Sequence, residues 1–242
     1  MSVITPIEEC ESLEDFYKKV VTEFLSLDIK DVAILYRGQL DSKWHLLPRI
    51  ATKYNNTGKM PTSFLEDERK NFDEFKRLGR PYIEAKVLEN DWDAIALAQH
   101  YGLHTRLLDW SQNPLVALWF AFEAEDSEVS HRAVWQFMLL EGDIANTSNG
   151  DPFNQKKTVA FKPSHITKRI TAQMGWFTTH RFLTASSTFV KLNANKSYEG
   201  HLVKIQIPNS ERENILKGLN LLGINRFTLF PDLDGLAKHL NG

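Results

Sequence analysis

The sequence has a single cysteine, Cys10, among its 242 residues, so no disulfide can form within the chain. A zinc site could use no more than one thiolate here, whereas many structural zinc sites use several. Scarcity of cysteine fits a reducing compartment, and we expect a cytoplasmic protein.

Long apolar runs are also missing. No stretch of about 18 apolar residues occurs, and the start MSVITPIEEC lacks a basic region followed by an apolar segment. We therefore expect neither secretion nor a membrane partner.

Charge of one sign is not in excess, since the formal net charge is −2. The whole molecule has no field typical of a nucleic-acid binder, although a local basic patch could be hidden in this sum. The candidate patch, segment 156–181, combines Lys156, Lys157, Lys162, Lys168, Arg169 and Arg181 with the aromatic residues Phe161, Trp176 and Phe177. A solvated surface is the alternative interpretation.

The composition is that of a globular protein, with 42% apolar, 11% aromatic and 25% charged residues. A chain of this length can bury one substantial core, and no repeat or low-complexity segment interrupts it. We predict one domain over residues 1–242.

Apolar spacing and capping patterns predict a largely helical first part. Ser63 with Glu66 three residues later forms a capping-box pattern at the start of one of these helices. The helices expected before residue 102 cover residues 10–26, 63–79, 83–89 and 91–101.

Two segments of this chain predict strands that carry polar residues. The run from Asp31 to Tyr36 predicts a strand that leads to Arg37. A second strand is expected over residues 103–111, with a period of two that places these residues on one face: Thr105, Leu107, Asp109 and Ser111.

Asn113 and Pro114 then begin an apolar helix that runs to Glu125, in which Ala117 and Ala121 lie one turn apart and allow a neighbouring element to approach closely. Downstream, the expected strands cover residues 133–140, 176–179, 188–192, 202–207 and 226–230, and the expected helices cover residues 215–222 and 233–240.

Three motifs carry a family resemblance. They are Tyr36-Arg37-Gly38-Gln39, the block from Leu97 to Pro114 that leads into Ala117, and the tail from Leu229 to Ala237. Together they resemble the FRG domain family, named for a Phe/Tyr-Arg-Gly signature. The resemblance extends over roughly residues 30–240.

The order of these motifs is also similar to that of ADP-ribosyltransferases of the arginine–serine–glutamate type. That resemblance implies an α+β fold in which a helical N-terminal part packs on a mixed, split β-sheet. The ADP-ribosyltransferase-like core would comprise residues 30–50 and 103–240, with a helical insertion at about 60–101.

The same resemblance implies NAD as substrate and no metal. A guanidinium such as that of Arg37 suits the phosphate or ribose oxygens of NAD, and the hydroxyl of Ser111 could hold the nicotinamide ribose. A carboxylate would stabilise the oxocarbenium-like transition state. No clear glutamate follows the serine; Gln173 lies at that place in the sequence, Asp232 is the other candidate, and a glutamine cannot carry the charge.

The expected catalytic residues are therefore Arg37, Asp109, Ser111 and Gln173. The expected NAD-binding residues are Tyr36, Gly38, Gln39, His100, Thr105 and Arg106. His100 and His104 have the spacing of metal ligands on a helix, but Gly102 lies between them and no third ligand is near.

Each of these assignments has a structural alternative. Arg37 could form a buried ion pair with Asp109, and Ser111 could be an N-cap or local turn residue for the following helix. A serine-hydrolase nucleophile is not expected at Ser111, since no Gly-x-Ser-x-Gly surrounds it. Arg106 could anchor a helix, and Asp232 could cap the last helix.

We expect a mono-ADP-ribosyltransferase that modifies a macromolecule, RNA or DNA among the candidates. A toxin or antiviral effector with a neutralising antitoxin protein is the expected biological setting. A non-catalytic nucleotide- or nucleic-acid-binding module and an NAD glycohydrolase are the alternatives.

Overall fold

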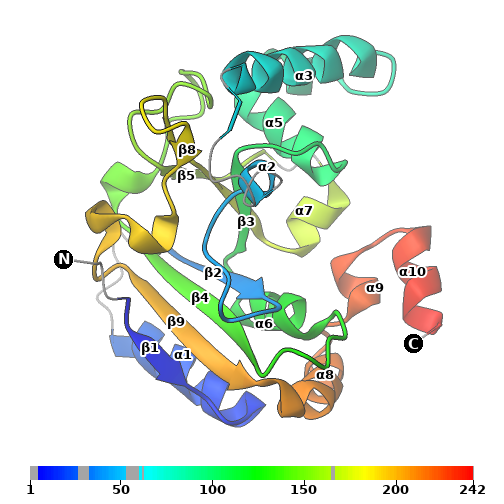
Figure 1. Ribbon diagram of the computed structural model, residues 1–242. Helices are drawn as coiled ribbons and strands as arrows, with labels where there is room; N and C mark the ends of the chain where they lie inside the picture. The colour runs from blue at the N-terminus through cyan, green and yellow to red at the C-terminus, as the bar shows by residue number, and fades with distance from the viewer. Residues whose placement is uncertain (1–4, 27–32, 53–59, 62, 165–166, 242) are drawn as a thin grey trace.

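The computed structural model describes residues 5–26, 33–52, 60, 61, 63–164 and 167–241 (Figure 1). In this part of the chain the fold is α+β, with one seven-stranded sheet and a small hairpin. The expected fold class is confirmed at this level.

The sheet is mixed. All neighbouring strands are antiparallel except β1 and β9, which run parallel. In spatial order the strands are β1 (Ile7–Glu9), β9 (Leu202–Pro208), β4 (His131–Leu139), β2 (Ala33–Gln39), β3 (Leu107–Ser111), β6 (Gly175–Thr179) and β5 (Val159–Phe161). The hairpin consists of β7 (Phe182–Leu183) and β8 (Thr188–Phe189).

The predicted split of the sheet is wrong, because the strands form one continuous sheet. Its two halves are nevertheless joined weakly. Strand β2 pairs with β4 along seven residues, from Ala33 to Gln39, but it pairs with β3 only at Tyr36 and Ser111. The sheet is therefore almost divided between β2 and β3.

Helices α1 (Leu13–Ser26), α6 (Pro114–Phe122) and α8 (Arg212–Leu221) cover one face of the sheet. The predicted periodicity fits, since Phe16 and Val20 of α1 are buried in this layer. On the opposite face, a second core surrounds Trp110, Trp135 and Phe137. It is closed by residues 192–198, which include the short 3-10 helices at Leu192–Ala194 and Lys196–Tyr198.

Close packing of α6 on β2 depends on Gly38. A Cβ atom built on Gly38 would lie 2.0 Å from the carbonyl oxygen of Ala117 and 2.5 Å from the amide nitrogen of Ala121. Both alanines are buried, which confirms the expected close approach. Any side chain at residue 38 would force the helix off the strand.

The helical part comprises α3 (Phe64–Gly79), α4 (Ala85–Glu89) and α5 (Asp91–His100), and α3 and α5 lie at the top of Figure 1. The expected capping box is wrong: the Ser63 hydroxyl donates to the Asp67 carboxylate at 2.7 Å instead of accepting from the helix backbone. The helix is held by tertiary contacts instead.

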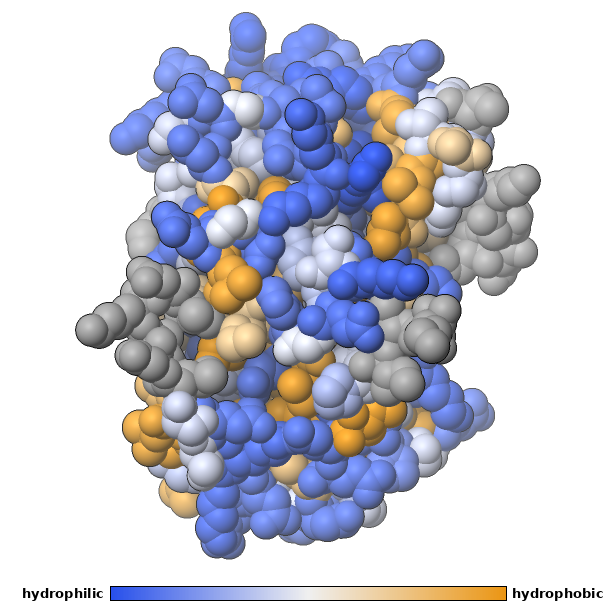
Figure 2. All heavy atoms as spheres, turned by 90° about the vertical axis from the view of Figure 1, so that its left-hand side faces the viewer, coloured by the Kyte–Doolittle hydropathy of each residue, from blue (hydrophilic) through white to orange (hydrophobic). Residues whose placement is uncertain are grey.

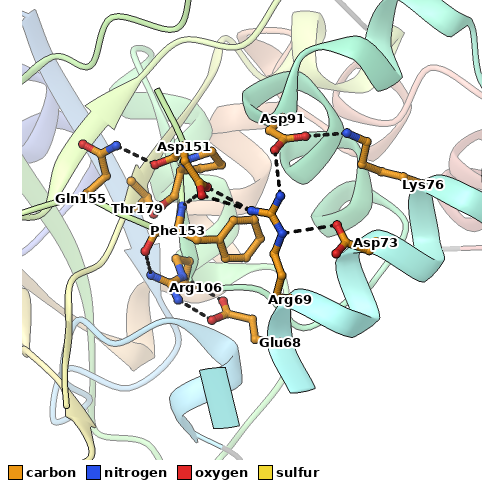
Figure 3. Close-up of polar contacts among 11 residues, drawn as sticks. Glu68, Arg69, Asp73, Lys76, Asp91, Arg106, Asp151, Phe153, Gln155 and Thr179 are labelled. Atoms are coloured by element: carbon orange, nitrogen blue, oxygen red, sulfur yellow. Dashed lines mark hydrogen bonds and ion pairs between the residues drawn. The ribbon is translucent and has the colours of Figure 1, made fainter. Parts of the chain in front are cut away.

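Polar contacts hold α3 on the sheet (Figure 3). Glu68 accepts from Arg106 at 2.9 Å, and both side chains are only 3% exposed. Beside this pair, Arg69 lies among three carboxylates, those of Asp73, Asp91 and Asp151, at 3.2–3.4 Å.

Two expected strand segments differ in the structure. Residues 226–230 do not form a strand, because α9 (Arg226–Leu229) begins at Asn225, whose side chain accepts from the Thr228 amide at 3.1 Å. This cap outweighs the local β propensity. Residues 103–106 were also expected to belong to a strand, but they lie before it. Strand β3 starts at Leu107, where pairing with β6 begins.

The remaining helices are short. They are α2 (Arg49–Thr52), α7 (Lys168–Ala172), α10 (Leu233–Leu240) and the 3-10 helices at Glu141–Asp143 and Asn209–Glu211. Helices α9 and α10 lie together at the right-hand edge of Figure 1. No helix in the described ranges is long and apolar enough to cross a membrane. The face shown in Figure 2 is mostly hydrophilic, with its hydrophobic side chains in small separate groups.

We predict that Gly38→Ala destabilises the protein by about 3 kcal/mol, the upper end of what overpacking costs, because the new methyl group meets backbone atoms that cannot rotate away. Chemical denaturation would measure the change. Gly142→Ala is the matched control, because a Cβ at Gly142 meets nothing within 4 Å. Equal stability of the two variants would contradict the close-packing account.

Candidate functional site

A cleft opens where β2 and β3 diverge. Continuing the register of the Tyr36–Ser111 pair would place Gly38 opposite Asp109, but the ladder stops at that pair. Instead, Nη1 of Arg37 donates to the backbone carbonyl of Asp109 at 2.7 Å. The guanidinium thus spans the gap between the strands, where a backbone hydrogen bond would otherwise lie.

The cleft has a volume of about 1190 Å³. That exceeds the roughly 300–1,000 Å³ typical of small-molecule sites and leaves room for a dinucleotide. Its walls come from β2, β3, the end of α5, the segment 40–49 and the segment around α7. In Figure 1 these labelled elements surround the middle of the molecule.

The lining of the cleft is rich in cations. Its basic side chains are Arg37, Lys43, Arg49, Arg169 and Lys191. Asp109 is the one carboxylate among the lining residues that the structure describes. A concave surface with this excess of positive charge attracts anions, and phosphate groups above all.

Arg37 and Asp109 do not form the buried ion pair that was the alternative interpretation. Nη1 of Arg37 lies 3.7 Å from Oδ2 of Asp109, and the Asp109 side chain is 63% exposed. Burial lowers the pKa of Arg37, and the Asp109 carboxylate raises it. Nε of Arg37 is buried without a hydrogen-bond partner among the described atoms, whereas the side chain as a whole is 23% exposed.

Arg169 reaches the cleft from α7. Its guanidinium lies 4.2 Å from the ring centroid of Phe230. Burial lowers the pKa of Arg169, and Asp109, Asp232 and Asp234 raise it. A cation over an aromatic face is held in place without being neutralised, so its charge remains available in the cleft.

His100 lines the cleft beside this cation. Burial lowers the pKa of His100, and Arg169 lowers it further, so the imidazole is neutral at pH 7. His104 is exposed and does not line the cleft. In the described part of the chain, no group of three His, Cys, Asp or Glu side chains could hold a metal ion.

Ser111 lines the cleft and is 4% exposed. Its hydroxyl donates to the carbonyl of Gln173 at 2.7 Å and accepts from the Asn113 amide at 2.9 Å. These contacts tie α7 and the start of α6 to β3. They match the local-turn alternative and leave the hydroxyl little capacity for a ligand.

Neither candidate for the third catalytic residue presents a free carboxylate. Gln173 lines the cleft, and its amide donates to the Leu229 carbonyl at 3.0 Å. Asp232 caps α10 by accepting from the Gly235 amide at 2.7 Å, as the structural alternative predicts. Asp109 is therefore the carboxylate that the cleft offers.

The structure separates the remaining predicted residues. Tyr36, Gly38 and Gln39 line the cleft, although the Gln39 amide also accepts from Trp135 Nε1 at 2.7 Å. Thr105 and Arg106 lie outside the cleft lining and are both buried.

Arg106 is committed to the fold. Besides its pair with Glu68, it donates to the Phe153 carbonyl at 2.7 Å (Figure 3). This arrangement places the Arg106 guanidinium in a buried pair outside the cleft lining, away from the residues proposed to bind NAD. The alternative, in which Arg106 anchors a helix, is confirmed.

The aromatic side chains of the basic segment 156–181 were expected to contribute to a nucleic-acid-binding patch, but they are buried. Phe161, Trp176 and Phe177 are 0%, 7% and 4% exposed. Lys157 pairs with Asp143 at 2.9 Å. These three rings therefore offer no exposed surface on which bases could stack.

Sequence reasoning missed a group of cleft residues: Lys43, Trp44, Arg49 and Lys191. The first three follow the end of β2, so their closeness to Arg37 in the sequence was a usable signal. Lys191 comes from a distant segment, and no local pattern marks it.

Comparison with known families gives one assignment. The model of the FRG domain matches residues 32–130. Over these residues the chain is similar to the FRG domain. Comparison with curated proteins and with solved structures found no significant match.

The FRG domain match begins at β2 and ends before β4, although β2 and β4 are paired neighbours in the sheet. The wider FRG domain predicted over residues 1–242 stays a prediction. Arg37, Asp109 and Ser111 lie within the matched FRG domain, whereas Arg169, Gln173 and Lys191 lie outside it. The cleft is thus built from the FRG domain and from later segments together.

We predict that Arg106→Met destabilises the protein by about 3–5 kcal/mol, because it leaves the Glu68 carboxylate buried and unpaired. The double variant Glu68→Met/Arg106→Met should recover most of this loss, since no buried charge remains. Denaturant titrations of the single and double variants would measure both effects. An equally unstable double variant would contradict this account.

A buried histidine behind the cleft predicts a pH dependence of stability. His180 is fully buried, and Nε2 lies 3.1 Å from the Thr178 hydroxyl, which accepts from Trp110 Nε1 at 2.9 Å. Burial lowers the pKa of His180 to about 3. Between about pH 3 and about pH 6.5, His180 is protonated in the unfolded chain but not in the folded protein. The contribution of His180 to the free energy of unfolding is therefore complete above about pH 6.5 and is lost as the pH falls.

We therefore expect His180 to contribute about 2 kcal/mol to the loss of unfolding free energy between pH 7.5 and pH 5.0. The variant His180→Gln should show a correspondingly smaller difference between the two pH values, whatever its absolute stability. His104→Gln is the control because His104 is exposed. The same pH dependence in all three proteins would rule out this role for His180.

Proposed function

We propose that the cleft binds NAD and that the protein is a mono-ADP-ribosyltransferase. The observation that carries the proposal is the Arg37 guanidinium in the gap between β2 and β3, beside the exposed carboxylate of Asp109. The volume of about 1190 Å³ supports a dinucleotide-sized ligand.

The cations suit the pyrophosphate of NAD. A planar guanidinium forms paired hydrogen bonds with phosphate oxygens, and the Arg37 side chain lines the cleft and is 23% exposed. Arg169, which comes from α7, supplies a second guanidinium to the cleft. Two fixed charges would hold the pyrophosphate and orient the rest of the dinucleotide.

Asp109 is the residue we assign to the reaction centre. In the proposed reaction the bond between ribose C1′ and the nicotinamide nitrogen breaks, and nicotinamide leaves as a neutral molecule with the bonding electrons. The ribose becomes oxocarbenium-like, and the carboxylate of Asp109 stabilises its positive charge. The nucleophile of the acceptor then bonds to C1′ and gives up its proton, which the neutral imidazole of His100 can accept.

This assignment places the carboxylate within the serine strand, whereas the resemblance implied a carboxylate downstream of that strand. Support comes from the position of Asp109 in the cleft and from the hydrogen bonds that occupy Gln173 and Asp232. The setting as a toxin or antiviral effector, with an antitoxin partner, stays a prediction.

The test is incubation of the purified protein with NAD labelled in the adenine, with and without RNA, DNA and cell lysate. Covalent label on a macromolecule supports the proposal. Release of free ADP-ribose alone indicates the glycohydrolase, and NAD binding without turnover indicates the binding module. Absence of NAD binding at millimolar concentration would overturn the proposal.

Two variants sharpen this test. We predict that Asp109→Asn lowers kcat by about 100-fold or more, with NAD affinity largely kept, because the charge it removes acts in the transition state. Arg37→Gln should weaken NAD binding by roughly 10- to 100-fold. Arg181→Gln, an exposed change outside the cleft, is the matched control.

A further inference from the structure

The segment that follows β2 forms a rim of the cleft with an unusual composition. It presents Trp44 with Lys43 and Arg49, and Lys191 joins them from a distant part of the chain. The Trp44 side chain is 51% exposed, although it lines the cleft. The donor chemistry proposed above uses none of these side chains.

Hydrogen bonds and one buried side chain fix the backbone of the rim. The Trp44 amide donates to the Asp41 carbonyl at 3.1 Å, and the Leu46 amide donates to the Asn193 side chain at 3.0 Å. Leu46 is completely buried, and its carbonyl accepts from the Leu192 amide at 3.0 Å. The exposed indole is therefore presented by an anchored backbone, which reduces the entropy lost on binding a ligand.

The cations of the rim are not neutralised within the described part of the chain. Lys43, Arg49 and Lys191 form no ion pair there. Asp41 is the neighbouring carboxylate, and its Oδ1 accepts from the Lys43 amide at 2.8 Å. Lys204 also lies nearby and donates to the Ser42 carbonyl at 2.7 Å. The balance of charge at the rim is positive.

An exposed aromatic ring among unpaired cations suits one class of ligand. Single-stranded nucleic acids are bound by base stacking on aromatic rings and by cations along the phosphate backbone. Duplexes keep their bases stacked within the helix and cannot use the ring in this way. The continuity of the rim with the cleft would bring such a strand next to Asp109.

We infer that this rim binds single-stranded nucleic acid, with a base on Trp44 and phosphates on Lys43, Arg49 and Lys191. This inference rests on the proposed function in one respect only: the bound strand is then the acceptor of ADP-ribose. The binding itself needs no NAD.

The test is fluorescence anisotropy of the full chain with labelled 12-nucleotide single strands of RNA and DNA, without NAD. Trp44→Ala should weaken binding by about 5- to 100-fold, the loss of one stacked base, and Trp44→Phe should restore part of it. Lys191→Gln should weaken binding and reduce its dependence on salt. Tyr82→Ala and Lys162→Gln, exposed changes outside the cleft, should have no effect.

Three results would overturn the inference: unchanged binding by Trp44→Ala, equal affinity for a duplex of the same sequence, or equal affinity for inorganic polyphosphate of the same charge. Arg37→Gln separates the two proposals. Retained strand binding with loss of NAD turnover supports the rim as a separate element. A protein that binds strands through Trp44 but never binds NAD supports the rim and refutes the transferase.

Discussion

The cleft depends on one hydrogen bond, in which the Arg37 side chain takes the place of the sheet ladder between β2 and β3. A backbone carbonyl that leaves a sheet ladder needs another donor, and the Arg37 guanidinium supplies it for Asp109 at a solvent-exposed position. The same guanidinium remains in the gap between the strands. One residue therefore bridges the opening and gives it positive charge.

The two sides of the opening have different origins in the chain. The FRG domain supplies β2, β3 and the anchored segment that carries Trp44, whereas Arg169 and Lys191 come from beyond residue 130. One group of lining residues contributes guanidinium groups, a neutral imidazole and one carboxylate. The outer rim offers a ring and flexible cations. The proposed reaction uses the first group for the donor and the second group for the acceptor.

Much of the fold could be predicted from local sequence. Apolar periodicity predicted α1 and α8, each of which buries one face, and the apolar run after Asn113 predicted α6, which is buried on nearly all sides. The small residues of α6 indicated close packing before its partner was known. The wrong predictions have physical causes. Residues 226–230 were expected to form a strand, but the side-chain cap at Asn225 begins a helical turn there. Strand β1 was not predicted, because it has only three residues and its partner β9 lies near the other end of the chain.

The candidate site was predictable to the extent that its residues share a motif. Arg37 and Asp109 lie in strongly marked segments and do meet, but the roles of neighbours on one strand could not be separated from sequence. Whether Ser111 faces a ligand or a carbonyl depends on Gln173, which lies far along the chain. Lys191 belongs to no recognisable pattern.

The alternation along β2 has a consequence for how this segment can vary. Gly38 faces α6 while the adjacent Arg37 faces the other side, so the two residues serve opposite surfaces of the same strand. A slip of one position would push a guanidinium against the helix and leave bare backbone at the opening. An insertion or deletion inside this strand would therefore disrupt both surfaces at once, even at positions where a single substitution would be tolerated.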